Sequence, residues 1–355
     1  MSDLIERKHV TVIAEAGVNH NGDLAMAKEL ACVAAEAGAD YVKYQTFIPE
    51  LVASQAAPKA AYQESETASD ETQLDMIKKL ALTFDEFRSL KAYCDTIGIQ
   101  FLSTAFDMQS LTFLHDLGMD MFKVPSGEIT NLPYLRAIGS YGLPVVLSTG
   151  MADLGEVEVA LDVLVQAGTA RSAVTVLHCT SQYPTPYNEV NLRAMLKMGS
   201  ELGVSVGYSD HTLGNEVSLV AVGLGASVIE KHFTLDTTLD GPDHAASVTP
   251  DGLSALISGI RAIEVAMGDG VKVPVEREIT MRTVARRSIV AARDIAQGEI
   301  FTADALLMKR PGDGISPMQL DQVLGHKAPR DFQVDENRDG VMDYSFSNPN
   351  FSFVQ

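Results

Sequence analysis

Two histidines, His211 and His232, each follow a short run rich in apolar and β-branched residues. Where two such runs form neighbouring parallel strands, both imidazoles reach the same edge of the sheet and can bind one divalent cation. The carboxylate of Glu15 follows a third run and is available beside them. The spacing therefore predicts a metal site. Hydrogen bonding of each histidine to its neighbouring loops is the alternative.

Lysines and hydroxyl side chains occupy equivalent positions after other runs. The lysines are Lys43 and Lys123, and the hydroxyls belong to Thr104, Ser126, Ser148 and Ser209. Ammonium and hydroxyl donors suit phosphate and carboxylate oxygens, so this set predicts an anionic substrate. For each lysine taken alone, a solvated surface charge is the alternative. The same positions also hold Gln45, Glu128, Tyr183 and Glu230.

A repeating pattern of elements has to bring these residues together. Strand-like runs at 10–14, 40–44, 99–103, 119–124, 144–148, 174–178, 204–208 and 227–230 alternate with helix-like stretches. The predicted helices are 24–37, 84–96, 108–117, 132–141, 154–167, 192–202, 216–224 and 250–267. Glycine follows many of them, which is the expected signal for a helix end before the next strand.

Eight β-then-α units predict a closed (β/α)8 TIM barrel. Active sites in this fold lie where strands end and the following loops begin, and the polar residues above stand at those positions. The competing fold is an open, doubly wound sheet. No G-x-G-x-x-G motif follows the first run to favour it.

Composition and net charge argue against several classes of partner and location. The chain has 355 residues and a formal net charge of −20, which repels phosphate backbones and anionic lipids. We therefore expect no nucleic-acid partner. The sequence has no signal-peptide pattern and no apolar stretch near the length of a membrane span, so we expect no membrane insertion. Three cysteines without metal-finger spacing fit a reducing cytoplasm.

The pattern changes after the barrel, which we place at residues 1–270. Residues 271–286 lack regular apolar spacing and predict a linker. Residues 287–336 predict a small β-rich module with short strands at 288–291, 299–301 and 305–308. A module of about 50 residues has a small hydrophobic core and is commonly stabilised by contact with a partner. For residues 337–355 we predict no structure.

Several long motifs resemble the sialic acid synthase family. They are AEAGVNHNG at 14–22, VKYQT at 42–46, FKVPSGE at 122–128, LSTGM at 147–151, HCT at 178–180, YPTP at 183–186, YSDHT at 208–212, IEKHFT at 229–234 and GPDH at 241–244. The resemblance covers roughly residues 10–335. KRPG at 309–312 and GISPM at 314–318 resemble the antifreeze-like (SAF) domain that follows the barrel in bacterial members.

The resemblance implies a transferase that condenses phosphoenolpyruvate with the open aldehyde form of an N-acetylated mannose-type sugar. Phosphate leaves by C–O cleavage and a nine-carbon 2-keto acid forms. It implies Mn²⁺ or Mg²⁺ on His211 and His232 as a Lewis acid, with Glu15 handling a proton or the attacking water. Phosphoenolpyruvate would contact Lys43, Thr104, Lys123, Ser126, Ser148 and Ser209. The sugar would contact Gln45, Glu128, Tyr183 and Asp243.

The family also implies a domain-swapped homodimer, in which Arg310 reaches the partner's barrel and meets the N-acetyl group of the sugar. A turn-flanking surface arginine is the alternative for Arg310. One departure concerns Ser181, where some members have Asn, and it puts a phosphate contact in doubt.

The acceptor sugar stays open between two candidates. N-acetylmannosamine would give N-acetylneuraminate, and 2,4-diacetamido-2,4,6-trideoxymannose would give N,N'-diacetyllegionaminate. Residues 57–63 and 128–133 are similar to both subfamilies. Our main prediction is the N-acetylneuraminate synthase. Two further alternatives are a metal-dependent sugar-phosphate aldolase or isomerase, and a non-enzymatic carbohydrate- or ice-binding module carried on a barrel scaffold.

Overall fold

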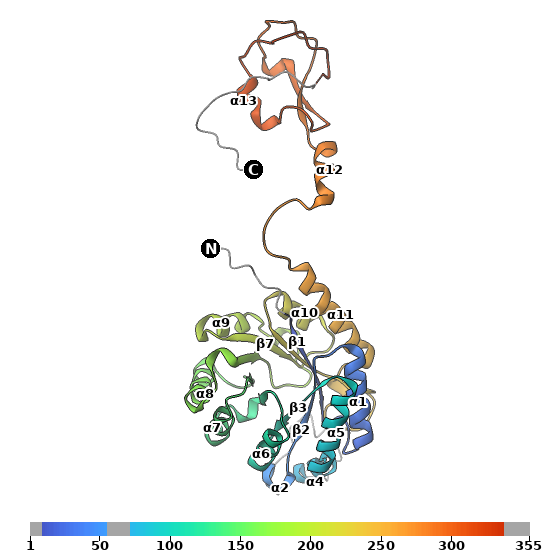
Figure 1. The fold of residues 1–355 in the computed structure, drawn as a ribbon, viewed down its shortest axis with the longest axis vertical. Helices are drawn as coiled ribbons and strands as arrows, with labels where there is room; N and C mark the ends of the chain where they lie inside the picture. The colour runs from blue at the N-terminus through green and yellow to red at the C-terminus, as the bar shows by residue number, and fades with distance from the viewer. Residues whose placement is uncertain (1–8, 55–71, 337–355) are drawn as a thin grey trace. The chain divides into compact units, whose positions relative to one another are not determined.

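Two compact units make up the chain in a computed structural model that describes residues 9–54 and 72–336 (Figure 1). The first unit extends to Gly270 and the second begins at Val271. The expectations for residues 57–63 and 337–355 lie outside the described residues.

The first unit is an eight-stranded parallel barrel. Its sheet has the order β3-β2-β1-β8-β7-β6-β5-β4. Strands β3 and β4 lie in contact, although no hydrogen-bonded ladder joins them in the described part of the chain. The strands are β1 (Thr11–Gly17), β2 (Tyr41–Thr46), β3 (Gln100–Ala105), β4 (Phe122–Val124), β5 (Val145–Ser148), β6 (Val174–His178), β7 (Ser205–Asp210) and β8 (Val228–His232). The predicted TIM-barrel class is confirmed.

Helices follow the strands and cover the outside of the barrel (Figure 1). They are α1 (Leu24–Ala37), α5 (Phe84–Ile97), α6 (Met108–Asp116), α7 (Leu132–Ser140), α8 (Leu154–Ala167), α9 (Arg193–Leu202), α10 (Glu216–Gly223) and α11 (Pro250–Ala266). Local sequence explains their ends: Asp23 caps the first turn of α1, and Gly38 ends it with φ of 85°. All eight lie within a few residues of the predicted ranges.

Four α-helices of the described residues were not predicted: three in connections, and α13 (Leu320–Val323) in the second unit. The connection from β2 to α5 carries α2 (Pro49–Val52) and α4 (Gln73–Leu80), and α12 (Glu276–Ala285) lies in the predicted linker. Thr72 caps α4, which buries Leu74, Met76 and Leu80, but eight residues give too short a periodic pattern to separate from a loop. Helix α12 buries no residue at all, so it leaves no amphipathic signal.

The second unit has its own small core. Strands β9 (Ser288–Ala291) and β10 (Leu306–Lys309) pair antiparallel, and the short helix α13 (Leu320–Val323) follows. Ile289, Ile295, Phe301 and Phe332 belong to the core cluster. The predicted strand at 299–301 is wrong, because Ile300 makes only an isolated bridge to Lys327. In the described ranges, no helix is long and apolar enough to cross a membrane.

Candidate active site

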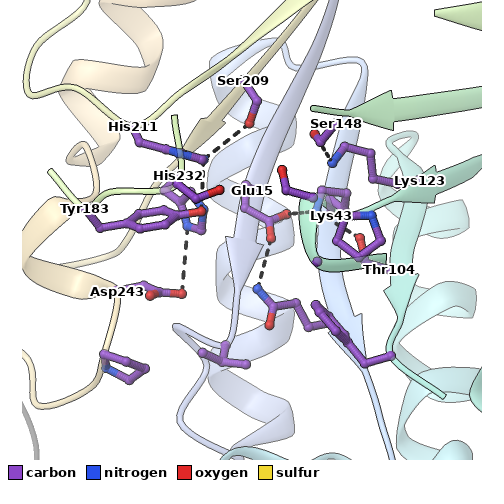
Figure 2. A pocket seen from close by; sticks show the side chains of 18 of the residues that line it. Glu15, Lys43, Thr104, Lys123, Ser148, Tyr183, Ser209, His211, His232 and Asp243 are labelled. Carbon is purple, nitrogen blue, oxygen red and sulfur yellow. Dashed lines mark hydrogen bonds and ion pairs between the residues drawn. The ribbon is translucent and has the colours of Figure 1, made fainter. Parts of the chain in front are cut away.

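A cavity of about 310 Å³ opens at the carboxyl ends of the barrel strands (Figure 2). Such a volume suits a small-molecule site. Most of the predicted site residues line it, from the carboxyl ends of the eight strands and the loops that follow them. These residues are Glu15, Lys43, Gln45, Thr104, Lys123, Ser126, Ser148, Tyr183, Ser209, His211, His232 and Asp243.

A β-bulge turns Glu15 toward Lys43. Glu15 pairs with Lys43 along the β1–β2 ladder, and the register then slips by one residue before Gly17. Glu15 Oε2 lies 2.8 Å from Lys43 Nζ, and Gln45 donates from Nε2 to Glu15 Oε1 at 3.3 Å. Gly17 has φ of 55°, and a Cβ there would lie 3.4 Å from Glu15 Oε1. The bulge and the glycine together leave room for the carboxylate.

The two lysines meet at a second carboxylate, Glu230. Lys43 Nζ lies 3.6 Å from Glu230 Oε2, and Lys123 Nζ lies 3.5 Å from Glu230 Oε1. Ser209 donates to Glu230 at 2.9 Å. Lys43 also donates to Thr104, at 3.1 Å, and Lys123 to Ser148, at 2.6 Å. All of these side chains are buried. The floor of the cavity is therefore a network of ion pairs and hydrogen bonds, and its charges are not solvated surface charges.

Glu230 is the member of this network that sequence reasoning left without a role. The sequence shows that Glu230 lies at a strand end, but it does not show whether this carboxylate pairs with substrate or with protein side chains. The structure places Glu230 between both lysines and beside Ser209. It therefore fixes the two ammonium groups at one spot.

The two carboxylates of the network have opposite pKa shifts. Burial alone would raise the pKa of Glu230, but Lys123 and Lys43 lower it to about 2. Burial raises the pKa of Glu15 to about 7, although Lys43 acts in the opposite direction. Glu230 is thus a permanent anion, whereas Glu15 exchanges a proton near neutral pH. This difference makes Glu15 the candidate acid or base.

His211 presents one nitrogen to the cavity in a defined state. Its Nδ1 lies 2.6 Å from the carbonyl oxygen of Thr180, so Nδ1 carries the proton and donates it. Nε2 is then an acceptor, 3.1 Å from the hydroxyl of Tyr183 and 3.4 Å from that of Ser209. Burial lowers the pKa of His211 to about 4. A neutral imidazole with a fixed tautomer is the form that binds metals.

His232 lies beside it, with the two ring centroids 5.6 Å apart. Its Nδ1 is buried and has no hydrogen-bond partner among the described residues. The carboxylate of Asp243 lies 4.0 Å from this nitrogen. Burial and the neighbouring His211 hold the pKa of His232 well below its usual range. Burial also raises the pKa of Asp243, to about 6.

The donor set fits a divalent cation, because a buried imidazole nitrogen without a partner stands beside one whose tautomer is fixed. Over residues 9–54 and 72–336, however, no three His, Cys, Asp or Glu side chains are arranged to hold a metal ion by themselves. A cation on His211 and His232 would thus need further ligands from water or substrate.

The predicted site residues Ser126, Glu128 and Arg310 make contacts of different kinds. Ser126 lines the cavity and accepts from the amide of Gly150 at 3.0 Å. Glu128 does not line it, and its carboxylate instead accepts from Asn131. Arg310 lies in the second unit, exposed, and donates to the carbonyl oxygen of Ala285 at 3.0 Å. Glu128 is therefore outside the cavity lining, whereas Arg310 belongs to the second unit.

A buried ion pair lies directly behind the two histidines. Asp210 and Lys231 are partners in the β7–β8 ladder, and each precedes one histidine. Lys231 Nζ lies 3.0 Å from Asp210 Oδ2 and donates to the Thr212 carbonyl at 2.6 Å. Asp210 also accepts from Ser218 of α10, at 2.6 Å. Because side chains alternate along a strand, this pair faces the helix layer while Glu230 and His232 face the cavity.

Comparison with known proteins places this site in a family. The model of the NeuB family matches residues 30–272, and that of the SAF domain matches residues 286–336. The chain belongs to the NeuB family. The N,N'-diacetyllegionaminic acid synthase of Campylobacter jejuni is 50% identical over 93% of this chain and 98% of its own length. That of Legionella pneumophila is 46% identical over 89% of each chain.

Solved structures agree with this assignment. The N-acetylneuraminic acid synthetase of Leptospira borgpetersenii has 33% identity and a TM-score of 0.67, covering 78% of this chain and 90% of that one. For this NeuB-family chain, the predicted resemblance, the SAF domain and the enzyme class of nonulosonic acid synthases are confirmed. Between the two predicted acceptors, the similarities favour the alternative, the legionaminate type, over our main prediction.

Proposed function

We propose that this chain is an N,N'-diacetyllegionaminic acid synthase. It condenses phosphoenolpyruvate with 2,4-diacetamido-2,4,6-trideoxymannose and releases phosphate. The chemistry rests on one observation above all: the buried ammonium groups of Lys43 and Lys123 share a cavity with the imidazoles of His211 and His232. The choice of sugar rests on the identity of 50% to the Campylobacter enzyme.

Phosphoenolpyruvate binds at the lysine end of the cavity. Among the described residues, the two ammonium groups there face Glu230, which they keep ionised, and Glu15, whose pKa burial raises to about 7. The remaining positive charge suits an anion. The hydroxyls of Thr104, Ser126, Ser148 and Ser209 supply further donors for its carboxylate and phosphate oxygens.

The sugar binds at the histidine end, with its aldehyde at His211 and His232. Tyr183, Asp243 and Gln45 line this end and bind its hydroxyl and acetamido groups. A Mn²⁺ or Mg²⁺ ion bound by the two histidines would supply Lewis-acid activation of the aldehyde oxygen. The unpartnered Nδ1 of His232 supports this assignment.

The reaction forms one carbon–carbon bond and breaks one carbon–oxygen bond. C3 of phosphoenolpyruvate attacks the aldehyde carbon, and water adds to C2. Glu15 accepts the proton of that water, a role for which a pKa of about 7 is suited. The proton from the water ends on the former aldehyde oxygen, which becomes a hydroxyl. Collapse of the C2 hydroxyl to a carbonyl then expels phosphate, which takes up the hydroxyl proton, and leaves the 2-keto acid. Lys43 and Lys123 stay paired with the anion throughout and offset the charge on the departing phosphate.

The assembly we propose is a homodimer in which Arg310 of each SAF domain completes the partner's barrel. Support comes from α12, on which Ile279, Met281 and Val284 are each more than half exposed. Apolar side chains on a helix that buries nothing call for a covering surface, and a second copy of the chain supplies it.

The deciding experiment measures phosphate release from phosphoenolpyruvate with each acceptor sugar. We expect turnover with both, with the higher kcat/KM for the diacetamido sugar. Turnover of a sugar phosphate without phosphoenolpyruvate would support an aldolase or isomerase instead. If neither acceptor releases phosphate in the presence of Mn²⁺ or Mg²⁺, the proposed function is wrong.

A further inference from the structure

In the described part of the chain, six apolar side chains line one side of the active-site cavity. Val18, Phe47 and Phe106 are the first residues after β1, β2 and β3. The polar residues Glu15, Gln45 and Thr104 lie near the ends of these same strands. The apolar residues therefore form a layer just outside the polar floor. Helix α4 adds Met76, Ile77 and Leu80 to that layer. We call these six residues the apolar wall.

The wall is built into the fold. Val18, Phe47, Met76 and Leu80 form a buried cluster of their own, and Ile77 and Phe106 pack against it. The rings of Phe47 and Phe106 meet edge to face at 6.4 Å. A Cβ on Gly22 would lie 2.3 Å from the carbonyl oxygen of Lys79, so glycine lets the loop after β1 lie directly on α4. Four separate chain segments are thus packed into one surface.

Elsewhere the cavity lining is mostly polar, with Pro125, Met151 and Pro242 among its apolar residues. Tyr183, His211, His232 and Asp243 contribute hydroxyl, imidazole and carboxyl groups. A ligand that touches both sides needs polar groups toward the histidines and an apolar group toward the wall. A hydroxyl placed against the wall would lose its hydrogen bonds to water and gain none from these six side chains.

We propose that the apolar wall binds the C6 methyl group of the acceptor and thereby selects a 6-deoxy sugar. This inference rests on the proposed function, which puts C1 of the sugar at the histidines. C6 is the end of the carbon chain most remote from C1. In a 6-deoxy sugar it is a methyl group, whereas in N-acetylmannosamine it carries a hydroxyl. The wall supplies the contact that the methyl group needs and the hydroxyl cannot use.

Two sugars that differ only at C6 test this. They are 2-acetamido-2,6-dideoxymannose and N-acetylmannosamine, each assayed by phosphate release at saturating phosphoenolpyruvate. An apolar pocket discriminates against an added hydroxyl by up to about 100-fold. We expect kcat/KM to favour the 6-deoxy sugar by about 10- to 100-fold.

Matched glutamine variants locate the source of that preference. Ile77→Gln and Leu80→Gln place an amide in the wall, and Met151→Gln makes a similar change elsewhere in the cavity lining, where the side chain is exposed. We expect the two wall variants to bring the kcat/KM ratio of the two sugars close to one, and Met151→Gln to leave the ratio unchanged. Retained turnover of N-acetylmannosamine shows that a variant is folded.

The possible outcomes distinguish failure of the wall proposal from failure of the proposed function. Turnover of both sugars with equal kcat/KM in the wild type would overturn the wall proposal and leave the proposed function standing. A preference that survives both wall variants would place selection elsewhere and overturn it too. Absence of phosphate release with any acceptor would overturn the proposed function, and the wall proposal with it.

Discussion

Lys123 presents a buried charge to the active-site cavity. It is buried between Ser148 and Glu230, and burial lowers its pKa from the usual range. Replacing it with Met removes the charge while keeping a chain of similar length. Hydrogen bonds to charged groups contribute about 1.5–3 kcal/mol, so we expect kcat/KM for phosphoenolpyruvate to fall by roughly 10- to 150-fold. Steady-state kinetics checks this, and unchanged constants would show that the anion binds elsewhere.

Glu15 gives the site a pH dependence with a definite sign. Burial raises its pKa to about 7, so the carboxylate is mostly protonated below pH 6 and mostly ionised above pH 8. A proton acceptor works only in the ionised form. We therefore expect kcat/KM to rise through pH 7 and to level off above pH 8.

The control for this profile is Glu15→Gln, which keeps the shape and removes the titration. It should be slow at every pH and lack the rise near pH 7. If its profile keeps the wild-type rise, another group, such as Asp243 with a pKa of about 6, carries the titration.

Gly17, at the end of strand β1, leaves room for the side chains of Glu15 and Gln45. Gly17→Ala places a methyl group 3.3 Å from Gln45 Nε2 and 3.4 Å from Glu15 Oε1, at a residue with φ of 55°. We expect kcat to fall by at least about tenfold, since small displacements of reacting groups cost this much or more. Gly118→Ala is the matched control, because its φ is 84° and its Cβ would meet nothing within 4 Å. It should lose about 1–2 kcal/mol of stability and keep its activity.

The buried ion pair of Asp210 and Lys231 joins strands β7 and β8. Lys231→Met leaves Asp210 as an uncompensated buried charge, and breaking such a pair destabilises by about 3–5 kcal/mol. Denaturant unfolding measures this loss of free energy of unfolding. The double variant Asp210→Asn, Lys231→Met removes both charges and should recover much of it. If the single and double variants unfold alike, the charge is not the cause.

Periodicity predicted the barrel well, because eight strands and eight helices repeat one physical pattern. The buried runs around Ile13, Val146 and Ile229 are long enough to be distinctive, and polar residues at their ends follow from the fold. Helix α12 could not be found in this way, since it buries nothing. The β-bulge before Gly17 and the position of Glu230 between two lysines are three-dimensional facts that no spacing rule contains.

The proposed dimer makes a prediction for the whole molecule. If Arg310 serves the partner's barrel, an Arg310→Ala subunit and a Glu15→Ala subunit are each weak as homodimers. In their heterodimer, one barrel has an intact Glu15 and receives an intact Arg310. We therefore expect mixing, with subunit exchange, to restore about half of the wild-type activity per heterodimer.

The same mixing experiment has an opposite outcome if each Arg310 serves its own barrel. Neither site in the heterodimer would then be complete, and activity would stay at the level of the separate variants. Analytical ultracentrifugation of the mixture confirms that dimers are present. A monomer with full activity would exclude the proposed assembly.

The alternation along β8 restricts how this chain can change in evolution. Deleting one codon within β8 before Glu230 would reverse which side chains point inward, so that Lys231 would face the substrates and His232 the helices. The backbone hydrogen bonds from β8 to β1 and β7 could still form after such a deletion. Selection would thus remove length changes in the strands even where the fold survives them. Insertions would accumulate in connections instead, as between β2 and α5, where α2 and α4 already extend the loop.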